Sequence, residues 1–210
     1  MISGTVYGVA LNHKREALRL APAFTEAPYK APPIAPVVYI KTRNCVSAGG
    51  APVPLPSDLG EVALGATLAL LFGRDASRVD AGDALKAVDA ACLAIDVSEP
   101  LESYYRPAIR QLCREGFLPL GRFGALPPLD AEIVTAIDGV EAQRWSLAEL
   151  VRPAGQLIAD LSAFMTLKAG DLLLVGTADN PPRVTAGQRV DVTMAGMAPL
   201  TVRIEKEVRS

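Results

Sequence analysis

The strongest constraint on the fold is a pair of apolar segments of strand length that lie close together in the sequence. One segment runs from Ala63 to Gly73 and the other from Ala90 to Ser98, and a polar connection through Asp83 with a short helix-like piece separates them. Continuous apolar runs of this length predict buried strands. The second run carries one carboxylate, Asp96, and a buried carboxylate stays ionised only with a charged partner, a metal or hydrogen bonds. Asp96 is therefore a candidate functional residue.

Composition predicts a globular protein of one domain, residues 1–210, with a lid and strand region at residues 1–60. Half of the 210 residues are hydrophobic, and the net charge of −2 argues against a general affinity for nucleic acid or acidic membranes. The first residues do not resemble a signal peptide, and the longest apolar run is too short to span a bilayer. Three widely spaced cysteines fit buried thiols in a reducing compartment. We therefore expect a cytoplasmic protein.

The rest of the chain predicts many short strands, few helices and abundant turns. Residues 22–36 and 53–56 are rich in proline and predict a loop and a connection without regular structure. Residues 153–165 have apolar residues at helical spacing, and residues 16–20 and 146–151 predict short helical pieces or turns. The fold class is therefore α+β and mostly β. The expected strands are 5–11, 37–41, 172–177, 190–194 and 200–204, with a hairpin at 132–145 closed by Asp138-Gly139.

The only histidine, His13, follows the first predicted strand. A histidine titrates near neutral pH and is a candidate general base at the end of a strand. The more frequent alternative is a histidine whose ring is satisfied by backbone groups. The residues alone leave both interpretations open.

Two groups of cations are candidates for binding a substrate carboxylate. Lys41 and Arg43 end a predicted strand, and Arg106, Arg110 and Arg114 are spaced i, i+4 and i+8. On a helix these three arginines would share one face, and arginine binds carboxylates through paired hydrogen bonds. Solvated charges at a strand end and on a helix face, paired with nearby glutamates, are equally consistent with the pattern.

Several short motifs follow one another across nearly the whole chain, and together they resemble the fumarylacetoacetate hydrolase family. The resemblance implies a mixed β-sandwich roll with a few short helices. It also implies a divalent cation, usually Mg²⁺, held by a Glu-x-Glu pair and a later Asp, which chelates a 2-oxo acid and stabilises an enolate. The motifs are Ala10-Leu-Asn12, Tyr39-Ile-Lys41, Phe72-Gly73, Ala94 to Ser98, Leu161-Ser162, Met165 to Leu167, Gly170 to Thr177 and Ala186 to Val190.

A narrower likeness points to one branch of this family, the isomerase/decarboxylases of 4-hydroxyphenylacetate (homoprotocatechuate) degradation. The chain resembles their N-terminal half or separate N-terminal subunit. The likeness implies decarboxylation of 5-carboxymethyl-2-oxo-hex-3-ene-1,7-dioate and isomerisation of 2-hydroxyhepta-2,4-diene-1,7-dioate to its 2-oxo form. It rests on Val9 to His13, Pro28 to Pro33, Ile40 to Asn44, Ser103 to Ile109 and Cys113 to Phe117.

The chain departs from the family at the implied metal site. Counted back from Phe72-Gly73, the two glutamate positions fall on Gly65 and Thr67, so Asp96 is the one acidic ligand left. A site that loses two negative charges holds Mg²⁺ weakly, and we expect this chain alone not to bind it. The His-x-x-Glu dyad of many members falls on Glu16 and Arg19.

Three hypotheses follow. The chain is a subunit that works with a metal-bearing homologue or as a homodimer, or it is a metal-free isomerase acting alone, or it is a non-catalytic binding or structural member. The implied substrate is a small 2-oxo dicarboxylate or tricarboxylate. The candidate catalytic residues are His13, Glu16 and Asp96, and the candidate substrate-binding residues are Asn12, Lys41, Arg43, Arg106, Arg110, Arg114 and Thr177.

Overall fold

The two apolar segments form the longest strands of the protein. The computed structural model describes residues 3–100 and 108–207, and in it β5 (Val62–Phe72) pairs in antiparallel register with β6 (Val88–Ser98). Nearly every residue of β5 is buried because both faces of the strand are covered. The register places Gly65 directly opposite Asp96, so both residues belong to the same face of the sheet.

The larger sheet has β5 and β6 at its centre. Its strand order is β2-β1-β10-β5-β6-β7-β3, and β11 also pairs with β5. The pairing of β1 with β10 is parallel and joins residues 6–8 to residues 172–174. The remaining strands of this sheet are β1 (Val6–Ala10), β2 (Val37–Lys41), β3 (Val46–Ala48), β7 (Leu118–Leu120), β10 (Leu172–Leu174) and β11 (Arg183–Val184).

The smaller sheet has the order β4-β13-β12-β8-β9. The predicted hairpin is confirmed, and its turn residues Asp138 and Gly139 have φ angles of 49° and 83°. The expected connection at residues 53–56 instead contains β4, an edge strand, where Pro54 removes no ladder hydrogen bond that the sheet requires. The strands are β4 (Val53–Leu55), β8 (Glu132–Ile137), β9 (Val140–Ser146), β12 (Arg189–Met194) and β13 (Leu200–Lys206).

The main core lies between one face of the larger sheet, the smaller sheet and the helix α3 (Ala154–Ser162). Leu64 and Leu68 of β5 belong to this core, together with side chains of β12 and β13 and the apolar face of α3. Strand residues alternate between faces, so Ala63, Gly65 and Thr67 belong to the opposite face of β5. The α+β, mostly β fold class is confirmed. The face of β5 that carries Ala63 and Gly65 does not belong to this core, and it forms the floor of the pocket described below.

The larger sheet is strongly curled. Its two edge strands, β2 and β3, are joined in sequence by the short helix η1 (Arg43–Cys45), although they lie at opposite ends of the strand order. Strands in a sheet are spaced about 4.8 Å apart, so a flat sheet would separate β2 from β6 by roughly 19 Å. Side chains of β2 nevertheless contact Asp96 of β6. The curl therefore brings β2 over the floor made by β5 and β6.

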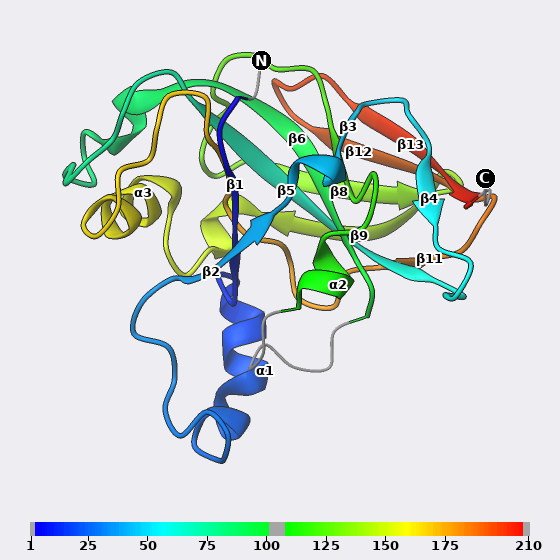
Figure 1. The fold of residues 1–210 in the computed structure, drawn as a ribbon, viewed down its shortest axis with the longest axis horizontal. Helices are drawn as coiled ribbons and strands as arrows, with labels where there is room; N and C mark the ends of the chain where they lie inside the picture. Colours follow the sequence, from blue (N-terminus) through cyan, green and yellow to red (C-terminus); the bar gives the residue numbers. More distant parts are fainter. Residues whose placement is uncertain (1–2, 101–107, 208–210) are drawn as a thin grey trace.

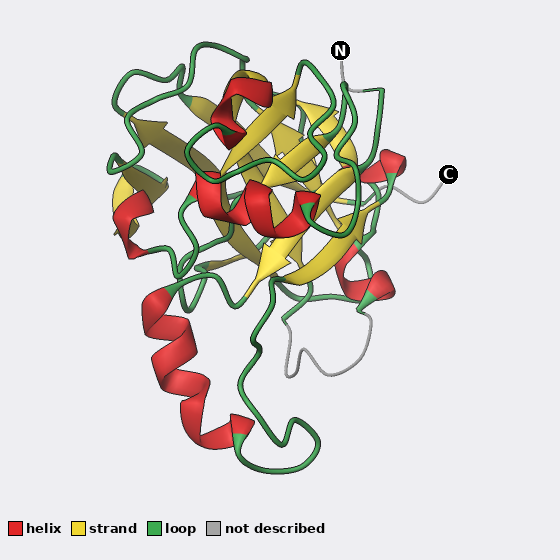
Figure 2. Ribbon diagram, turned by 90° about the vertical axis from the view of Figure 1, so that its left-hand side faces the viewer, coloured by secondary structure: helices red, strands yellow, loops and turns green. Residues whose placement is uncertain are grey.

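One helix stands apart from the sheets. The helix α1 (Lys14–Phe24) projects from the body with the loop that follows it, as Figures 1 and 2 show. It extends beyond the helix expected at residues 16–20 and includes Pro22, so the loop expected at residues 22–36 begins only after Phe24. The other helical segments are η2 (Ala84–Ala87), α2 (Ile109–Leu112) and η3 (Leu147–Glu149). None of the helices in the described ranges is long and apolar enough to cross a membrane.

The predicted three-arginine helix face is not formed in the part of the chain that the structure describes. Arg110 lies in α2, but α2 ends at Leu112, and Arg114 lies beyond its end. Arg106 lies outside the described residues.

Candidate functional site

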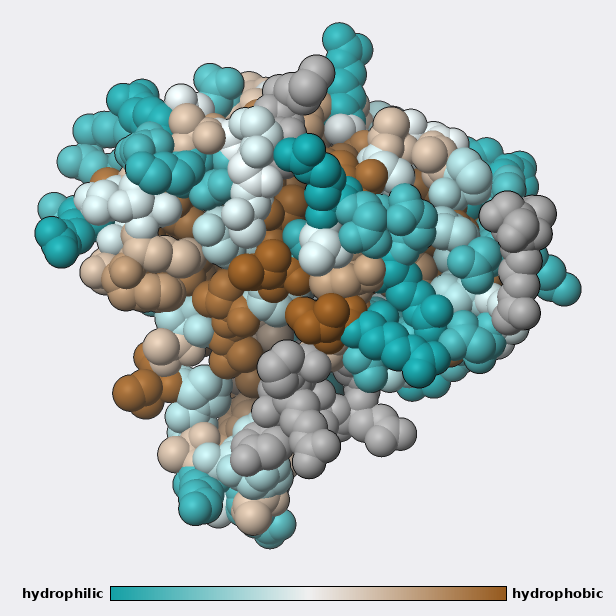
Figure 3. All heavy atoms as spheres, viewed as in Figure 1, coloured by the Kyte–Doolittle hydropathy of each residue, from teal (hydrophilic) through white to brown (hydrophobic). Residues whose placement is uncertain are grey.

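A pocket of about 660 Å³ opens where α1, β2 and α2 meet the second face of β5 and β6. Figure 3 shows apolar side chains gathered on the same side of the molecule, around β2 and α2. The wall is largely apolar, and its polar side chains are few, as in most small-molecule sites. The polar lining residues are Glu16, Arg19, Tyr29, Tyr39, Asp96, Ser98, Thr177, Asn180 and Arg183.

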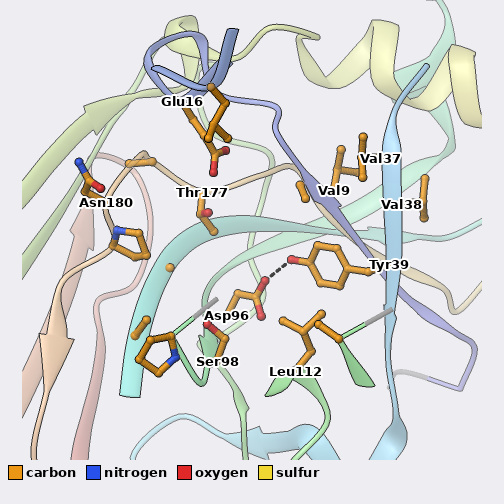
Figure 4. Close-up of a pocket in the computed structure, with 18 of the residues that line it drawn as sticks. Val9, Glu16, Val37, Val38, Tyr39, Asp96, Ser98, Leu112, Thr177 and Asn180 are labelled. Atoms are coloured by element: carbon orange, nitrogen blue, oxygen red, sulfur yellow. Dashed lines mark hydrogen bonds between the residues drawn. The ribbon is translucent and has the colours of Figure 1, made fainter. Parts of the chain in front are cut away.

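Asp96 lies at the floor of the pocket and is 8% exposed. One carboxylate oxygen, Oδ1, lies 2.6 Å from Nζ of Lys41. The other, Oδ2, accepts a hydrogen bond from the hydroxyl of Tyr39, which Figure 4 shows reaching from β2 toward Asp96. The cation and the phenol satisfy the charge of the buried carboxylate, which answers the question that the sequence raised about Asp96.

Lys41 has a fully buried side chain. Besides the Asp96 carboxylate, its ammonium donates hydrogen bonds to the carbonyl oxygens of Val97 and Phe117, at 2.6 and 3.0 Å. Two of the three N–H donors of this ammonium are thus bound to backbone carbonyls, and its contact with Asp96 is an ion pair. Lys41 does not line the pocket, and its role in the geometry is to hold Asp96 from behind.

Glu16 enters the pocket from the opposite wall. It lies in the first turn of α1, where the helix dipole favours a carboxylate, and it is 7% exposed. Figure 4 shows its side chain directed toward Thr177, on the far side of the pocket from Tyr39 and Asp96. The pocket therefore presents two carboxylates from two different walls.

Two arginines line the pocket at its rim. Arg19 of α1 donates hydrogen bonds from Nε and Nη2 to the carboxylate of Asp179, at 2.8 to 3.1 Å. Arg183 of β11 donates one from Nη1 to Glu61, at 2.6 Å. Neither arginine was among the residues predicted to bind substrate, and Tyr39 was missed as well. Arg19 is placed there by α1, Arg183 by the pairing of β11 with β5, and Tyr39 by the curl that brings β2 over the floor.

Several predicted site residues lie elsewhere. Asn12 is buried, and its amide bridges the backbone of Arg152 and Val175. Arg43 is exposed in η1 and does not line the pocket. Arg110 and Arg114 are paired with Asp58 and Glu99 outside the pocket lining. Of the predicted residues, the structure brings Glu16, Asp96 and Thr177 to the pocket, with Lys41 immediately behind it.

His13 is 1% exposed and lies outside the pocket lining. Its ring packs edge-on against Trp145, and Nε2 lies 3.5 Å from a carboxylate oxygen of Glu149. Neither ring nitrogen has a hydrogen-bond partner among the described residues. Burial lowers the pKa of His13 from its ordinary 6.5, and the nearby carboxylates of Glu149 and Asp179 oppose this only in part. The geometry favours a neutral, packed histidine.

The residues at the implied metal position do not fit a divalent cation. Gly65 and Thr67 lie on the pocket face of β5 without carboxylates, and the Thr67 hydroxyl donates to the carbonyl of Gly176 at 2.6 Å. Both oxygens of Asp96 already have protein partners, one of them an ammonium. No cluster of three or more His, Cys, Asp or Glu side chains suited to a metal occurs within residues 3–100 and 108–207. Mg²⁺ prefers several hard oxygen ligands, which this arrangement does not supply.

The sequence profile described as fumarylacetoacetate (FAA) hydrolase C-terminal matches residues 5–205. The chain is 44% identical over 201 residues to the 4-hydroxyphenylacetate degradation bifunctional isomerase/decarboxylase of Escherichia coli. The matched region covers 95% of this chain but 46% of that protein. The chain thus spans about half the length of such relatives. It is also 29% identical to the E. coli oxaloacetate tautomerase YcgM, over 83% of this chain and 84% of that protein.

Solved structures share the fold. The 5-carboxymethyl-2-hydroxymuconate delta-isomerase of Mycobacterium smegmatis superposes with a TM-score of 0.84 at 26% identity, covering all of this chain and 81% of that one. The fumarylpyruvate hydrolase of Pseudomonas aeruginosa, solved with Mn²⁺ and pyruvate, has a TM-score of 0.82 at 22% identity over 97% of this chain and 90% of that one. A divalent metal therefore does bind in a protein of the same fold.

Proposed function

Since this chain belongs to the fumarylacetoacetate hydrolase family, we propose that it is one unit of an isomerase/decarboxylase of aromatic catabolism. The proposed substrates are 5-carboxymethyl-2-oxo-hex-3-ene-1,7-dioate and 2-hydroxyhepta-2,4-diene-1,7-dioate. The unit works with a homologous partner that carries the metal ligands. The site of action is the cytoplasm, and the assembly is a pair of homologous subunits.

The observation that carries the proposal is the contrast among the relatives. Identity is 43–44% over 95% of the chain to relatives named as bifunctional isomerase/decarboxylases, against 29% to a relative named as an oxaloacetate tautomerase. The bifunctional relatives are about twice as long as the part that this chain matches. A chain that corresponds to half of a bifunctional enzyme is expected to need the other half. The assignment to their N-terminal half stays a prediction.

The donor set of the pocket supports the need for a partner. Stabilising the enolate of a 2-oxo acid requires positive charge aimed at the developing oxyanion. Here the ammonium of Lys41 is bound to two backbone carbonyls and paired with Asp96, and positions 65 and 67 carry no carboxylates to hold a cation. In the proposal this charge is supplied by the partner, and this chain's own pocket binds and orients.

A second function has one specific observation in its favour. Isomerisation of a 2-hydroxydienoate moves a proton from the hydroxyl to a carbon, so acid/base groups are needed at two points of the substrate. Glu16 and the Tyr39–Asp96 pair line the same pocket from different walls. Under this alternative, Glu16 and Asp96 are the proton carriers of a metal-free isomerase, and His13 is not one because it lies outside the pocket.

The test compares the chain alone with the chain co-purified with a homologue that has Glu at the positions matching 65 and 67. Isomerisation is followed by loss of the dienol absorbance, and decarboxylation by release of carbon dioxide. The proposal predicts little turnover by the chain alone, recovery with the partner, and loss again in excess EDTA. Full isomerase activity of the chain alone in EDTA would overturn it in favour of the metal-free alternative.

The non-catalytic alternative has its own signature. A chain that gives no turnover alone or with the partner, yet binds dicarboxylates saturably, has a binding or structural role. Metal analysis of the purified chain and of the co-purified pair completes the set. The proposal predicts that the co-purified pair contains metal in proportion to the amount of partner, and that the chain alone contains none.

A further inference from the structure

We infer that Arg183 is the residue that recognises a ligand carboxylate at the mouth of the pocket. This inference rests on the proposed function, since it assumes that the pocket takes a small dicarboxylate. The sequence drew attention to Arg106, Arg110 and Arg114 instead. Of these, the two that the structure describes are engaged with acidic side chains outside the pocket lining.

The strand register places Arg183 on the correct face of the sheet. Arg183 of β11 pairs with Ala63 of β5, and Ala63 pairs on its other side with Ser98 of β6. Residues paired across neighbouring strands share a face, so Arg183 belongs to the face that carries Gly65 and Asp96. All five of these residues line the pocket. Arg183 and Asp96 thus extend from the same face of one sheet.

The two ends of this floor differ in charge. Arg183 and Asp96 lie on opposite sides of β5, so they are about 10 Å apart across the sheet and about 7 Å apart along it. The Asp96 end presents a carboxylate whose cation, Lys41, does not line the pocket, and it repels an anionic group of a ligand. A ligand carboxylate is therefore expected at Arg183 and not at Asp96.

The guanidinium retains donors for a ligand. Among the described residues its side chain donates one hydrogen bond, from Nη1 to Glu61, and arginine has five N–H donors in a planar fork. The side chains of Arg183 and Glu61 are 59% and 40% exposed. An exposed ion pair is weak, so Glu61 orients the guanidinium without preventing a bidentate contact with a second carboxylate. Arg19 is less suitable because both Nε and Nη2 are bound to Asp179.

The test uses heptanedioate and heptanediamide as a matched pair of probes, which have the same chain length and differ in the charge of their ends. Binding to the full chain is measured by calorimetry in EDTA, for the wild type and for Arg183→Gln, Glu61→Gln and Arg144→Gln. Arg144 is the matched control because it is a half-exposed arginine of β9, paired with Glu132 and Glu141, and does not line the pocket.

We expect Arg183→Gln to lower heptanedioate affinity about tenfold or more, the size typical of a charged hydrogen bond, and to leave heptanediamide affinity nearly unchanged. Glu61→Gln should leave heptanedioate affinity unchanged or raise it, since a competing carboxylate is lost, and Arg144→Gln should match the wild type. Circular dichroism checks that each variant is folded.

Equal losses for both probes in Arg183→Gln, or a loss of the same size in Arg144→Gln, would overturn the inference. So would a wild-type chain that binds neither probe or does not prefer the dicarboxylate. These outcomes leave the proposed function to be judged separately, by turnover of the chain with its partner. A pair that turns over the dienoate while Arg183→Gln keeps its dicarboxylate preference would refute Arg183 alone.

Discussion

The floor of the pocket and the surface outside it both bring acidic and basic side chains together, but in opposite environments. At the floor, Lys41 and Asp96 are almost fully buried. Outside the pocket, Arg110 has a side chain that is 70% exposed, and its partner Asp58 is 43% exposed. The contact distances are similar, 2.6 and 2.7 Å. The difference between these ion pairs is therefore the solvent around them and not their geometry.

This difference decides which charges matter. Exposed ion pairs contribute little to stability, whereas breaking a buried pair leaves a charge that is neither paired nor solvated. In the sequence the regularly spaced arginines are the more conspicuous feature, and Lys41 is a single residue at the end of a short strand. In the folded protein Lys41 matters more for stability and for the pocket than these arginines do.

The largest effect is expected from Lys41→Met. This substitution leaves the Asp96 carboxylate buried without its cation, and such a loss costs about 3–5 kcal/mol of the free energy of unfolding. Urea denaturation followed by circular dichroism measures it. The double variant Lys41→Met with Asp96→Asn should lose less than the two single variants together. Strict additivity would mean that the pair does not interact as the geometry indicates.

The next effect concerns the missing glutamates at the floor. Gly65→Glu with Thr67→Glu should create Mg²⁺ affinity measurable by calorimetry, because it supplies two carboxylates on the same face as Asp96. A Cβ at residue 65 would lie 2.4 Å from Cγ2 of Thr177, so the double variant should lose about 1–3 kcal/mol without metal.

Added Mg²⁺ should then raise the melting temperature of this variant and not that of the wild type. Gly65→Ala is the control for the steric cost alone. If the double variant folds and binds no metal, the alignment that assigns the two glutamate positions to residues 65 and 67 is wrong.

A smaller effect is expected from pH. Since burial lowers the pKa of His13 below 6.5, the unfolded chain binds more protons than the folded one as the pH falls through that value. Stability should therefore decrease from pH 7.5 toward pH 5. His13→Leu should flatten this dependence, because neither ring nitrogen has a hydrogen-bond partner among the described residues. An unchanged slope would assign the pH dependence to other groups.

The smallest effect is expected outside the pocket. Arg110→Gln removes an exposed partner of Asp58, and Arg114 stays within hydrogen-bond distance of the same carboxylate. The melting temperature and the heptanedioate affinity should equal those of the wild type within error. A clear loss of binding would mean that Arg110 binds the ligand, as the spacing of the arginines suggested, and would remove the contrast between the floor and the surface outside the pocket.

The local elements could be predicted from the sequence because local physics sets them. The apolar runs gave β5 and β6, the Asp138-Gly139 turn gave the β8–β9 hairpin, and the apolar spacing after Pro153 gave α3. Strand β4 could not be predicted, since Pro54 is compatible with a strand only at the edge of a sheet. The length of α1 was underestimated, because the residues from Pro22 onward were expected to form a loop.

The site was less predictable because it depends on the curl of the larger sheet. Asp96 and Glu16 could be proposed from their positions in the sequence and from the family likeness. Tyr39 and Arg183 could not, since each becomes a pocket residue only when β2 and β11 are placed around β5 and β6. No periodicity in a single segment encodes that arrangement.

The parallel pairing of β1 with β10 has a consequence for folding. Strand β1 joins β2 to the rest of the sheet, because it pairs with β2 on one side and with β10 on the other. Its pairing with residues 172–174 of β10 spans more than 150 intervening residues. Contacts of such high sequence separation form slowly, because a long loop must be closed before any pairing energy is gained. Tyr39 and Lys41 therefore reach Asp96 late. During synthesis the chain can form the β8–β9 hairpin early, but the pocket can close only after β10 has emerged.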